Sequence, residues 1–377
     1  MNRNSFTQTC LLALALSTAV STAHAGTALT LEPGASVASV LGNAILEVRD
    51  LVRHQDFVAD ALAVIAAEGG ETAPLSKVVE QLGAHAMAAS RLQRANRSLR
   101  ALKGLPEQGA DLLQVRVLLP EGTQREDFAL SAYRVAAVPM GEDRLDTMVR
   151  TYAADGSMLE IGIDARPAFP LLLVEVDTRT ALREGMKVVN EGLLAAGLQT
   201  LPAQVAQADT LDITRLDRIR LAADQEPNLK GAAEIFAIVS GLQVDEKKPE
   251  MHTFEMPWLE YDKTDYYPGQ PWIQWDNYRY DVANVQLFEE DGETNYKTML
   301  SALIKVVGAT IGPIQPSVGL VSVIADAVLT VMPDAWFVDE HDYVDSFYLL
   351  QRGQAYTSRP GAGANATVDL TPITLGK

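Results

Sequence analysis

The chain has 377 residues, of which 47% are hydrophobic, and a formal net charge of −18 at pH 7. This length and apolar content suit two or three packed domains, while the acidic excess repels phosphate backbones and argues against nucleic acid as a partner. The only cysteine is Cys10, which leaves the remainder of the chain without a disulfide, a thiolate nucleophile or a cysteine-based zinc site.

The first 25 residues have the features of a secretory signal peptide. Arg3 precedes an apolar run at 11–16, and small residues that end at Ala25 form a cleavage site. The run is too short to span a hydrocarbon layer of about 30 Å, and Cys10 lies upstream of the cleavage site. We therefore expect export to the periplasm or the outside, with no stable membrane anchor.

Residues 26–105 predict a helical N-terminal unit. Between Ser36 and Ala67, apolar side chains recur every three or four residues, as on one face of a helix, and Ser36 is placed as its N-cap. A second helical stretch covers 75–105. Five basic residues lie along this second stretch, and we interpret them as a solvated face, with docking onto the acidic remainder of the chain as the alternative. These are Arg91, Arg94, Arg97, Arg100 and Lys103.

Residues 106–198 predict a small α+β domain. Five short strand-like runs, at 112–119, 130–138, 148–153, 159–163 and 171–176, precede a helix. Asp155-Gly156 is typical of a hairpin turn, Asp177 is placed to cap the helix, and Gly197 is placed to end it. Residues 199–212 lack periodicity and are interpreted as a linker.

Residues 213–377 predict a β-sandwich with an inserted helical hairpin at about 294–332. Strand-like runs alternate with acidic turns. Calcium takes about six to eight oxygen ligands, so carboxylates that converge at a sheet edge would suit it better than zinc; solvated turns are the alternative. The predicted ligands are Asp224, Glu226, Asp339, Asp342 and Asp345, with Asp262 and Asp265 as second candidates.

No nucleotide or redox cofactor is indicated. The chain has no phosphate loop that ends in Gly-Lys-Ser/Thr and no GxSxG elbow. The stretch 361–366 imitates half of a dinucleotide fingerprint, but no helix is expected after it, and we interpret it as a flexible turn.

Aromatic residues are concentrated between 254 and 280, which holds nine of the 24 in the chain. Their mixture with acids is typical of a sugar-binding groove, whereas the simpler interpretation is a long loop that large side chains pin to the sheet. A carbohydrate-active hydrolase could use Glu260 or Asp262, because that chemistry needs only a pair of carboxylates at a suitable separation.

Four blocks of the C-terminal part carry a family resemblance: 224–227, 233–236, 261–268 and 339–348. Together they resemble the proteobacterial secreted family catalogued as domain of unknown function 3103. The resemblance covers most of the exported chain. It implies a bacterial, exported protein and carries no activity with it.

The sequence therefore predicts an α+β fold with a helical N-terminal unit, a small α+β middle domain and a C-terminal β-sandwich that contains a helical hairpin. The leading hypothesis is an exported, non-catalytic binding or structural module with a calcium-stabilised sandwich. The alternative is a carbohydrate-active hydrolase that uses residues 254–280. A glycan or a protein is the expected kind of ligand, and the sequence leaves the oligomeric state open.

Overall fold

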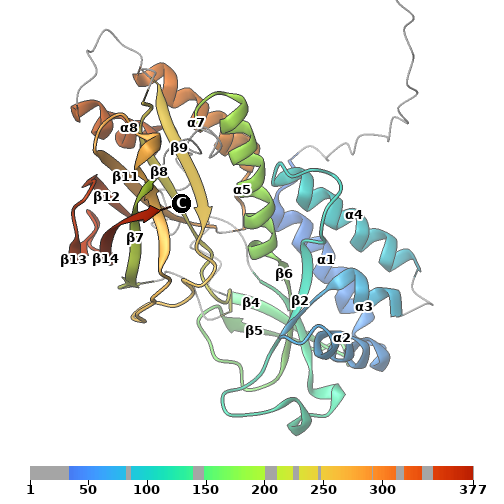
Figure 1. The fold of residues 1–377 in the computed structure, drawn as a ribbon. Coiled ribbons are helices and arrows are strands. Elements are labelled where there is room, and N and C mark those ends of the chain that lie inside the picture. Colours follow the sequence, from blue (N-terminus) through green and yellow to red (C-terminus); the bar gives the residue numbers. More distant parts are fainter. Residues whose placement is uncertain are drawn as a thin grey trace, which may run out of the picture. The chain divides into compact units, whose positions relative to one another are not determined.

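The structure is a computed structural model. It describes residues 34–81, 86–138, 148–199, 210–223, 229–244, 248–290, 292–310, 318–332 and 343–376. In these parts of the chain, seven α-helices pack on three β-sheets, and the C-terminal part is rich in strands (Figure 1). The predicted α+β class is confirmed. Within the same ranges, no helix has both the length and the apolar character that a membrane span requires.

Four helices lie against one face of the first sheet (Figure 1). They are α1 (Val37–Leu51), α2 (Gln55–Ala67), α3 (Leu75–Gln81) and α4 (Ala86–Leu102). Ser36 caps α1 as predicted, since its Oγ accepts a hydrogen bond from the backbone N of Ser39 at 3.1 Å. The helical stretch expected up to Ala67 is divided in two, because the chain turns after α1 and buries Val52 completely at the turn.

The first sheet has the strand order β1-β2-β6-β3-β4-β5, with β3 parallel to β6 and the other neighbours antiparallel. Its strands are β1 (Thr72–Pro74), β2 (Leu113–Leu118), β3 (Arg134–Ala137), β4 (Met148–Ala153), β5 (Met158–Gly162) and β6 (Leu171–Val176). Two short 3-10 helices, η1 (Arg125–Asp127) and η2 (Leu130–Ala132), precede β3.

Turns and caps in this region follow their local signals. Gly156 joins β4 to β5 with a φ of 82°, as the predicted hairpin requires. Asp177 caps α5 (Thr178–Ala195) by accepting a hydrogen bond from the backbone N of Thr180 at 2.8 Å. Gly197, with a φ of 68°, follows the end of that helix. Each of these predictions is confirmed.

The C-terminal part is a sandwich of two antiparallel sheets, ordered β10-β7-β14-β13 and β12-β11-β8-β9. The strands are β7 (Thr210–Leu221), β8 (Ile235–Leu242), β9 (Pro249–Glu255), β10 (Gln270–Gln274), β11 (Val282–Glu289), β12 (Tyr343–Gln351), β13 (Tyr356–Pro360) and β14 (Ala366–Gly376), with the 3-10 helix η3 (Trp275–Asn277) after β10. Side chains from both sheets form one core, which includes Trp272, Val285 and Val368. The predicted sandwich is confirmed.

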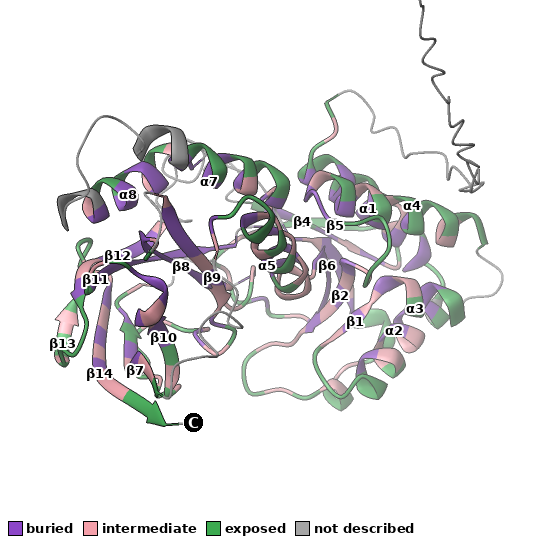
Figure 2. Ribbon diagram, turned by 45° about the horizontal axis from the view of Figure 1, so that its top comes forward, coloured by how far each residue is buried: buried purple, intermediate pink, exposed green. Residues whose placement is uncertain are grey.

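The predicted helical hairpin is also present, as α7 (Tyr296–Thr310) and α8 (Val318–Val331). Helix α8 packs on β8 and β11, on the face of their sheet that points away from the sandwich core. Every residue of β8 and of β11 is consequently buried (Figure 2). Burial on both faces explains why β8 carries a nearly continuous apolar run in place of an alternation.

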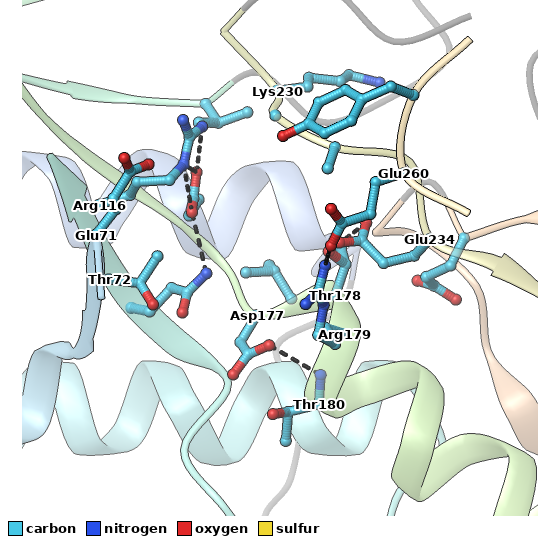
Figure 3. Close-up of a pocket in the computed structure, with 18 residues that line it drawn as sticks. Glu71, Thr72, Arg116, Asp177, Thr178, Arg179, Thr180, Lys230, Glu234 and Glu260 are labelled. Atoms are coloured by element: carbon cyan, nitrogen blue, oxygen red, sulfur yellow. Dashed lines mark hydrogen bonds and ion pairs between the residues drawn. The ribbon is translucent and has the colours of Figure 1, made fainter. Parts of the chain in front are cut away.

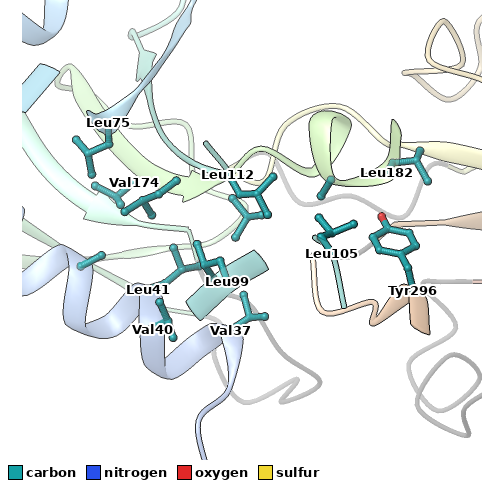
Figure 4. Close-up of a cluster of buried hydrophobic side chains, with 14 of the residues drawn as sticks. Val37, Val40, Leu41, Leu75, Leu99, Leu105, Leu112, Val174, Leu182 and Tyr296 are labelled. Carbon is teal, nitrogen blue, oxygen red and sulfur yellow. The ribbon is translucent and has the colours of Figure 1, made fainter. Parts of the chain in front are cut away.

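A single hydrophobic cluster extends from Val37 in α1 to Met332 after α8. It joins α4, the first sheet, α5 and α7, and Figure 4 shows Leu99, Leu105 and Tyr296 within it. The cluster thus contains residues from all three segments that the sequence predicts as separate domains. Residues 31–377 form one compact unit.

The basic face expected on the second helical stretch is corrected at two positions. The side chains of Arg100 and Lys103 are 1% and 0% exposed, whereas that of Arg91 is 57% exposed. Arg100 pairs with Glu184 in α5 at 2.5 Å, and Lys103 pairs with Glu290 at 2.5 Å. A solvated face is therefore wrong for these two residues, which dock onto acids of the later chain because burial of a cation requires a partner.

Candidate functional site

A pocket of about 640 Å³ lies beside the beginning of α5 (Figure 3). Its wall is built from β1, β2, the end of β6, the first turn of α5, the segment 230–234 that leads into β8, and residues 260–261 after β9. Segments far apart in the sequence therefore meet here, and most of the side chains that they contribute are polar or charged.

One wall is an ion pair that crosses from β2 to β6. Arg116 donates to both carboxylate oxygens of Glu175, through Nε at 2.9 and 3.0 Å and through Nη2 at 2.9 Å. Gln114 donates to the same carboxylate at 3.0 Å, and Arg116 also donates to the carbonyl of Leu229 at 2.7 Å. This fork geometry fixes the guanidinium in place.

Burial changes the pKa of both members of this pair. Burial raises the pKa of Glu175, and the charge and hydrogen bonds of Arg116 offset only part of that effect. Burial also acts to lower the pKa of Arg116, but the attraction of Glu175 outweighs it and the pKa of the guanidinium rises. The two groups therefore hold each other in the wall of the pocket.

A second ion pair lies at the first turn of α5. Arg179 donates to Glu260 at 2.5 Å, and the hydroxyl of Thr178 donates to Glu234 at 2.8 Å. Burial acts to lower the pKa of Arg179, but Glu260, Glu234 and Asp177 together raise it. Figure 3 shows Glu260 directly beside Arg179 and Glu234 next to them.

The described part of the chain gives the pocket an excess of negative charge. Six carboxylates and three cationic side chains line it. Two of the cations are those of the ion pairs above, and the third is Lys230, across the pocket from Asp177 in Figure 3. A pocket of this kind favours ligands that carry a positive group, because the protein's field within a cleft raises the local concentration of the opposite charge.

Of these groups, Glu260 was predicted as an acid and Asp177 as a helix cap, whereas Arg116 and Glu175 were not predicted. The signal was nonetheless present. Each of the two is the only charged residue within an apolar strand, LQVRVL in β2 and LLLVEV in β6. A lone charge in a strand with buried neighbours indicates a buried ion pair, since charges are almost never fully buried without a partner.

Four of the seven predicted calcium ligands, Asp224, Glu226, Asp339 and Asp342, lie outside the described residues. The other three bind to protein groups. Asp262 pairs with Lys263 at 2.6 Å, and Asp265 pairs with Arg218 at 2.7 Å. In the ranges that the structure describes, no three acidic, histidine or cysteine side chains are gathered closely enough to hold a metal.

Asp345, the remaining predicted ligand, is fully buried and holds a loop. Its carboxylate accepts hydrogen bonds from the backbone N of Ser346 at 2.8 Å and from those of Gly363 and Ala366 at 2.7 Å. A Cβ at Gly361 would lie 2.2 Å from Cγ of Asp345. The glycines that were interpreted as a flexible turn are therefore needed for the backbone to approach this carboxylate.

Comparison with known proteins identifies a family. A family model described as a protein of unknown function, DUF3103, matches residues 47–377. The chain belongs to that family, as the resemblance of its acidic and aromatic blocks predicted. Neither the curated proteins nor the solved structures include a significant match.

Proposed function

We propose that this member of the DUF3103 family is an exported, non-catalytic binding module whose ligand occupies the pocket beside α5. The observation that supports this best is the way in which the charged wall is held. Arg116 and Arg179 are fixed by Glu175 and Glu260, on a sheet and at a helix end. Charged groups that rigid elements fix in advance bind a ligand without a large ordering cost.

The ligand class follows from volume and charge. A pocket of about 640 Å³ lies within the range of roughly 300–1,000 Å³ that is usual for small-molecule sites. Its carboxylates outnumber its cations, and the cations would pair with an acidic group on the same ligand. A basic amino acid or a short basic peptide combines both features, and we propose this class.

Titration calorimetry of the full chain at low salt tests the proposal, with arginine and lysine as probes and glutamate as the anionic control. We expect the basic probes to bind. Glu234→Gln keeps a group that can accept from Thr178 but removes a charge, and it should weaken binding by about 10- to 100-fold, the usual worth of a charged hydrogen bond. Glu160→Gln, an exposed acid on β5, is the matched control. Equal binding of arginine and glutamate, or no heat with either basic probe, would refute it.

We also propose a calcium site in the sandwich, because Ala223 and Val344, which lie next to two of the acidic turns in the sequence, are joined through Asn365. Asn365 donates to the carbonyl of Ala223 at 3.1 Å and to that of Val344 at 3.3 Å. Residues 224–226 directly follow the first of these positions, and 339–342 shortly precede the second. Bound calcium would therefore tie the end of β7 to the beginning of β12.

Thermal unfolding in chelator, then in millimolar calcium or magnesium, tests this part. A site that binds only the folded protein raises the stability by about 2.7 kcal/mol at 100 times its Kd. We expect a rise in Tm with calcium that Asp224→Asn and Asp342→Asn abolish, and no such rise with magnesium. An unchanged Tm in calcium contradicts the proposal.

The second candidate function is a carbohydrate-active hydrolase, and one observation favours it. Glu260 and Glu234 line the same pocket beside the exposed ring of Tyr261, and two carboxylates are what glycoside hydrolysis requires. Release of nitrophenol from a panel of nitrophenyl glycosides, lost in both Glu260→Gln and Glu234→Gln, would establish this function over the binding module. Absence of turnover with every glycoside would refute the hydrolase and leave the binding module as the one proposed function.

A further inference from the structure

A second pocket, of about 590 Å³, lies at the N-terminal helices and the first sheet and shares no lining residue with the pocket beside α5. Its lining comes from the turn between α1 and α2, the start of α2, η2, the first residue of β3, the β4–β5 hairpin and Phe169 before β6. These segments meet because α1 packs on β3 and α2 packs on η2. The volume lies within the range of roughly 300–1,000 Å³ that is usual for small-molecule sites.

Much of this lining is apolar, and part of it is open to solvent. Val52 and Val58 are buried and Phe169 is half-buried, whereas Leu130 and Leu159 are 40% and 46% exposed. Large apolar side chains that stay exposed in a concave surface are typical of a ligand site. A ligand with a hydrocarbon part would remove this apolar surface from water, which is favourable.

The guanidinium of Arg134 lies in the wall of the pocket and is held there by neutral groups. Nε donates to Oγ1 of Thr151 at 2.7 Å, and Nη2 donates to the carbonyl oxygens of Thr151 and Ser157 at 3.1 and 2.9 Å. The guanidinium carbon lies 5.5 Å from the centre of the Phe169 ring. Burial lowers the pKa of Arg134, and the charge of Asp155 offsets only part of that effect. An anion beside this guanidinium would therefore stabilise its charge.

Arg134 also keeps a hydrogen-bond donor for a ligand. Nη1 carries two N–H groups, and its one hydrogen bond among the described residues is a long one, of 3.3 Å, to Oγ of Ser157. The bonds from the guanidinium to Ser157 are exposed, whereas the bond from Nε to Thr151 is partly buried. The edge of the guanidinium that carries Nη1 is consequently open to solvent.

The charged residues of this lining give it a net charge of +1. Arg53 is exposed, and its Nη2 would lie 3.6 Å from a Cβ at Gly156, so its side chain reaches to the tip of the β4–β5 hairpin. Asp155 is the one carboxylate among the described lining residues, against the two guanidiniums. Hydrogen bonds from the side chain and backbone of Ser157 lower the pKa of Asp155, so it is ionised at neutral pH. The pocket is therefore cationic in a chain whose net charge is −18.

We propose that this pocket binds a small apolar carboxylate, with its charged end at the two arginines and its hydrocarbon part on the exposed leucines. A carboxylate matches the flat fork of a guanidinium. Its single charge balances the net charge of the lining, whereas a phosphate monoester, with a charge of about −1.5 to −2, would leave an excess beside Asp155. The proposal does not depend on the function of the α5 pocket, where the excess charge is negative.

Two matched pairs of variants separate the charged and the apolar contributions. Arg53→Met removes an exposed guanidinium from the pocket, and Arg94→Met removes an exposed guanidinium from α4, which does not contribute to this lining. Leu159→Asn makes an apolar lining residue polar. Its neighbour Met158 is 54% exposed and is not a lining residue, and successive side chains of a strand point to opposite faces, so Met158→Asn is the control.

Titration calorimetry of the full chain at low salt provides the test, with octanoate as the probe. Octan-1-ol has the same hydrocarbon chain without the charge, and acetate has the charge without the chain. We expect octanoate to bind at least tenfold more tightly than either. Arg53→Met and Leu159→Asn should each weaken the binding of octanoate at least threefold, and Arg94→Met and Met158→Asn less than twofold, with little change of Tm in all four because these side chains are exposed.

Three results would overturn the proposal. The first is the absence of heat with millimolar octanoate. The second is binding of octan-1-ol or acetate as tight as that of octanoate, which would mean that the pocket does not combine an apolar and a charged contact. The third is an equal effect of the two members of either pair of variants, which would mean that octanoate binds elsewhere on the chain.

Discussion

Lys103→Met would remove one half of the buried ion pair that joins α4 to the C-terminal part of the chain. Nζ of Lys103 lies 2.5 Å from Oε1 of Glu290, and neither side chain is exposed at all. Glu290 also accepts from the hydroxyl of Tyr296 at 2.6 Å and from the backbone N of Gly292 at 3.1 Å. Methionine retains the length and apolar volume of the lysine stem, so the change is chiefly a loss of charge.

The expected loss of unfolding free energy depends on Glu290, which remains buried without its cationic partner. Without Lys103, the Glu290 carboxylate is buried with two neutral donors and no cation. Breaking a buried pair on one side costs about 3–5 kcal/mol of unfolding free energy. The double variant Lys103→Met with Glu290→Gln leaves no buried charge, and its amide oxygen can still accept from Tyr296. We expect it to recover at least half of the loss.

Urea unfolding of the full chain, followed by tryptophan fluorescence, measures both variants. Lys77→Met is the control, because Lys77 forms an ion pair of 2.6 Å with Glu68 in which the two side chains are 52% and 38% exposed. An exposed pair is worth less than about 1 kcal/mol. If Lys103→Met cost no more than Lys77→Met, or if the double variant were less stable than the single one, the argument from buried charge would be refuted.

Two further predictions concern the sandwich. Gly361→Ala places a Cβ 2.2 Å from Cγ of Asp345 and should lower the free energy of urea unfolding by about 1–3 kcal/mol, as overpacking does. The control Gly376→Ala has open space around it and should cost almost nothing. Equal losses of stability in the two variants would contradict the packing argument. Hydrogen bonds from Arg218 lower the pKa of both Asp265 and Asp369. Their contribution to stability is therefore present above the unfolded pKa and is lost as the pH falls through the lower folded values. Below about pH 4, Arg218→Met should flatten the fall in Tm, and an unchanged slope would contradict this assignment.

Local features of the fold were predictable because their causes lie within a few residues. Ser36 caps α1, Gly156 makes a hairpin turn, and Asp177 with Gly197 brackets α5, each through a bond or a dihedral angle that the neighbouring sequence determines. The sandwich and the helical hairpin were predictable for a related reason. Apolar spacing changes from the helical to the strand period where one element gives way to the next.

Long-range pairing was not predictable from the same patterns. The partners of Arg100 and Lys103 lie 84 and 187 residues further along the chain, so their helical spacing alone gave the interpretation of a solvated face. Glu260 was named as an acid of the aromatic segment, yet its place in the α5 pocket depends on Arg179, 81 residues before it. Periodicity reports which face of an element is apolar, and it does not report what that face meets.

The position of the α5 pocket follows from this long-range packing. Its wall takes Arg116 from β2, Arg179 from α5 and Glu260 from the sandwich, and the core that brings these elements together runs from α1 to α8. Strands β8 and β11 are buried on both faces, by the sandwich on one side and by that core on the other. Excision of the sandwich at residue 213 would expose the second face and leave Glu290 without Lys103. The Arg179–Glu260 pair of the pocket therefore exists only in the assembled chain, because it joins α5 to the segment after β9, whereas the Arg116–Glu175 pair lies within the first sheet.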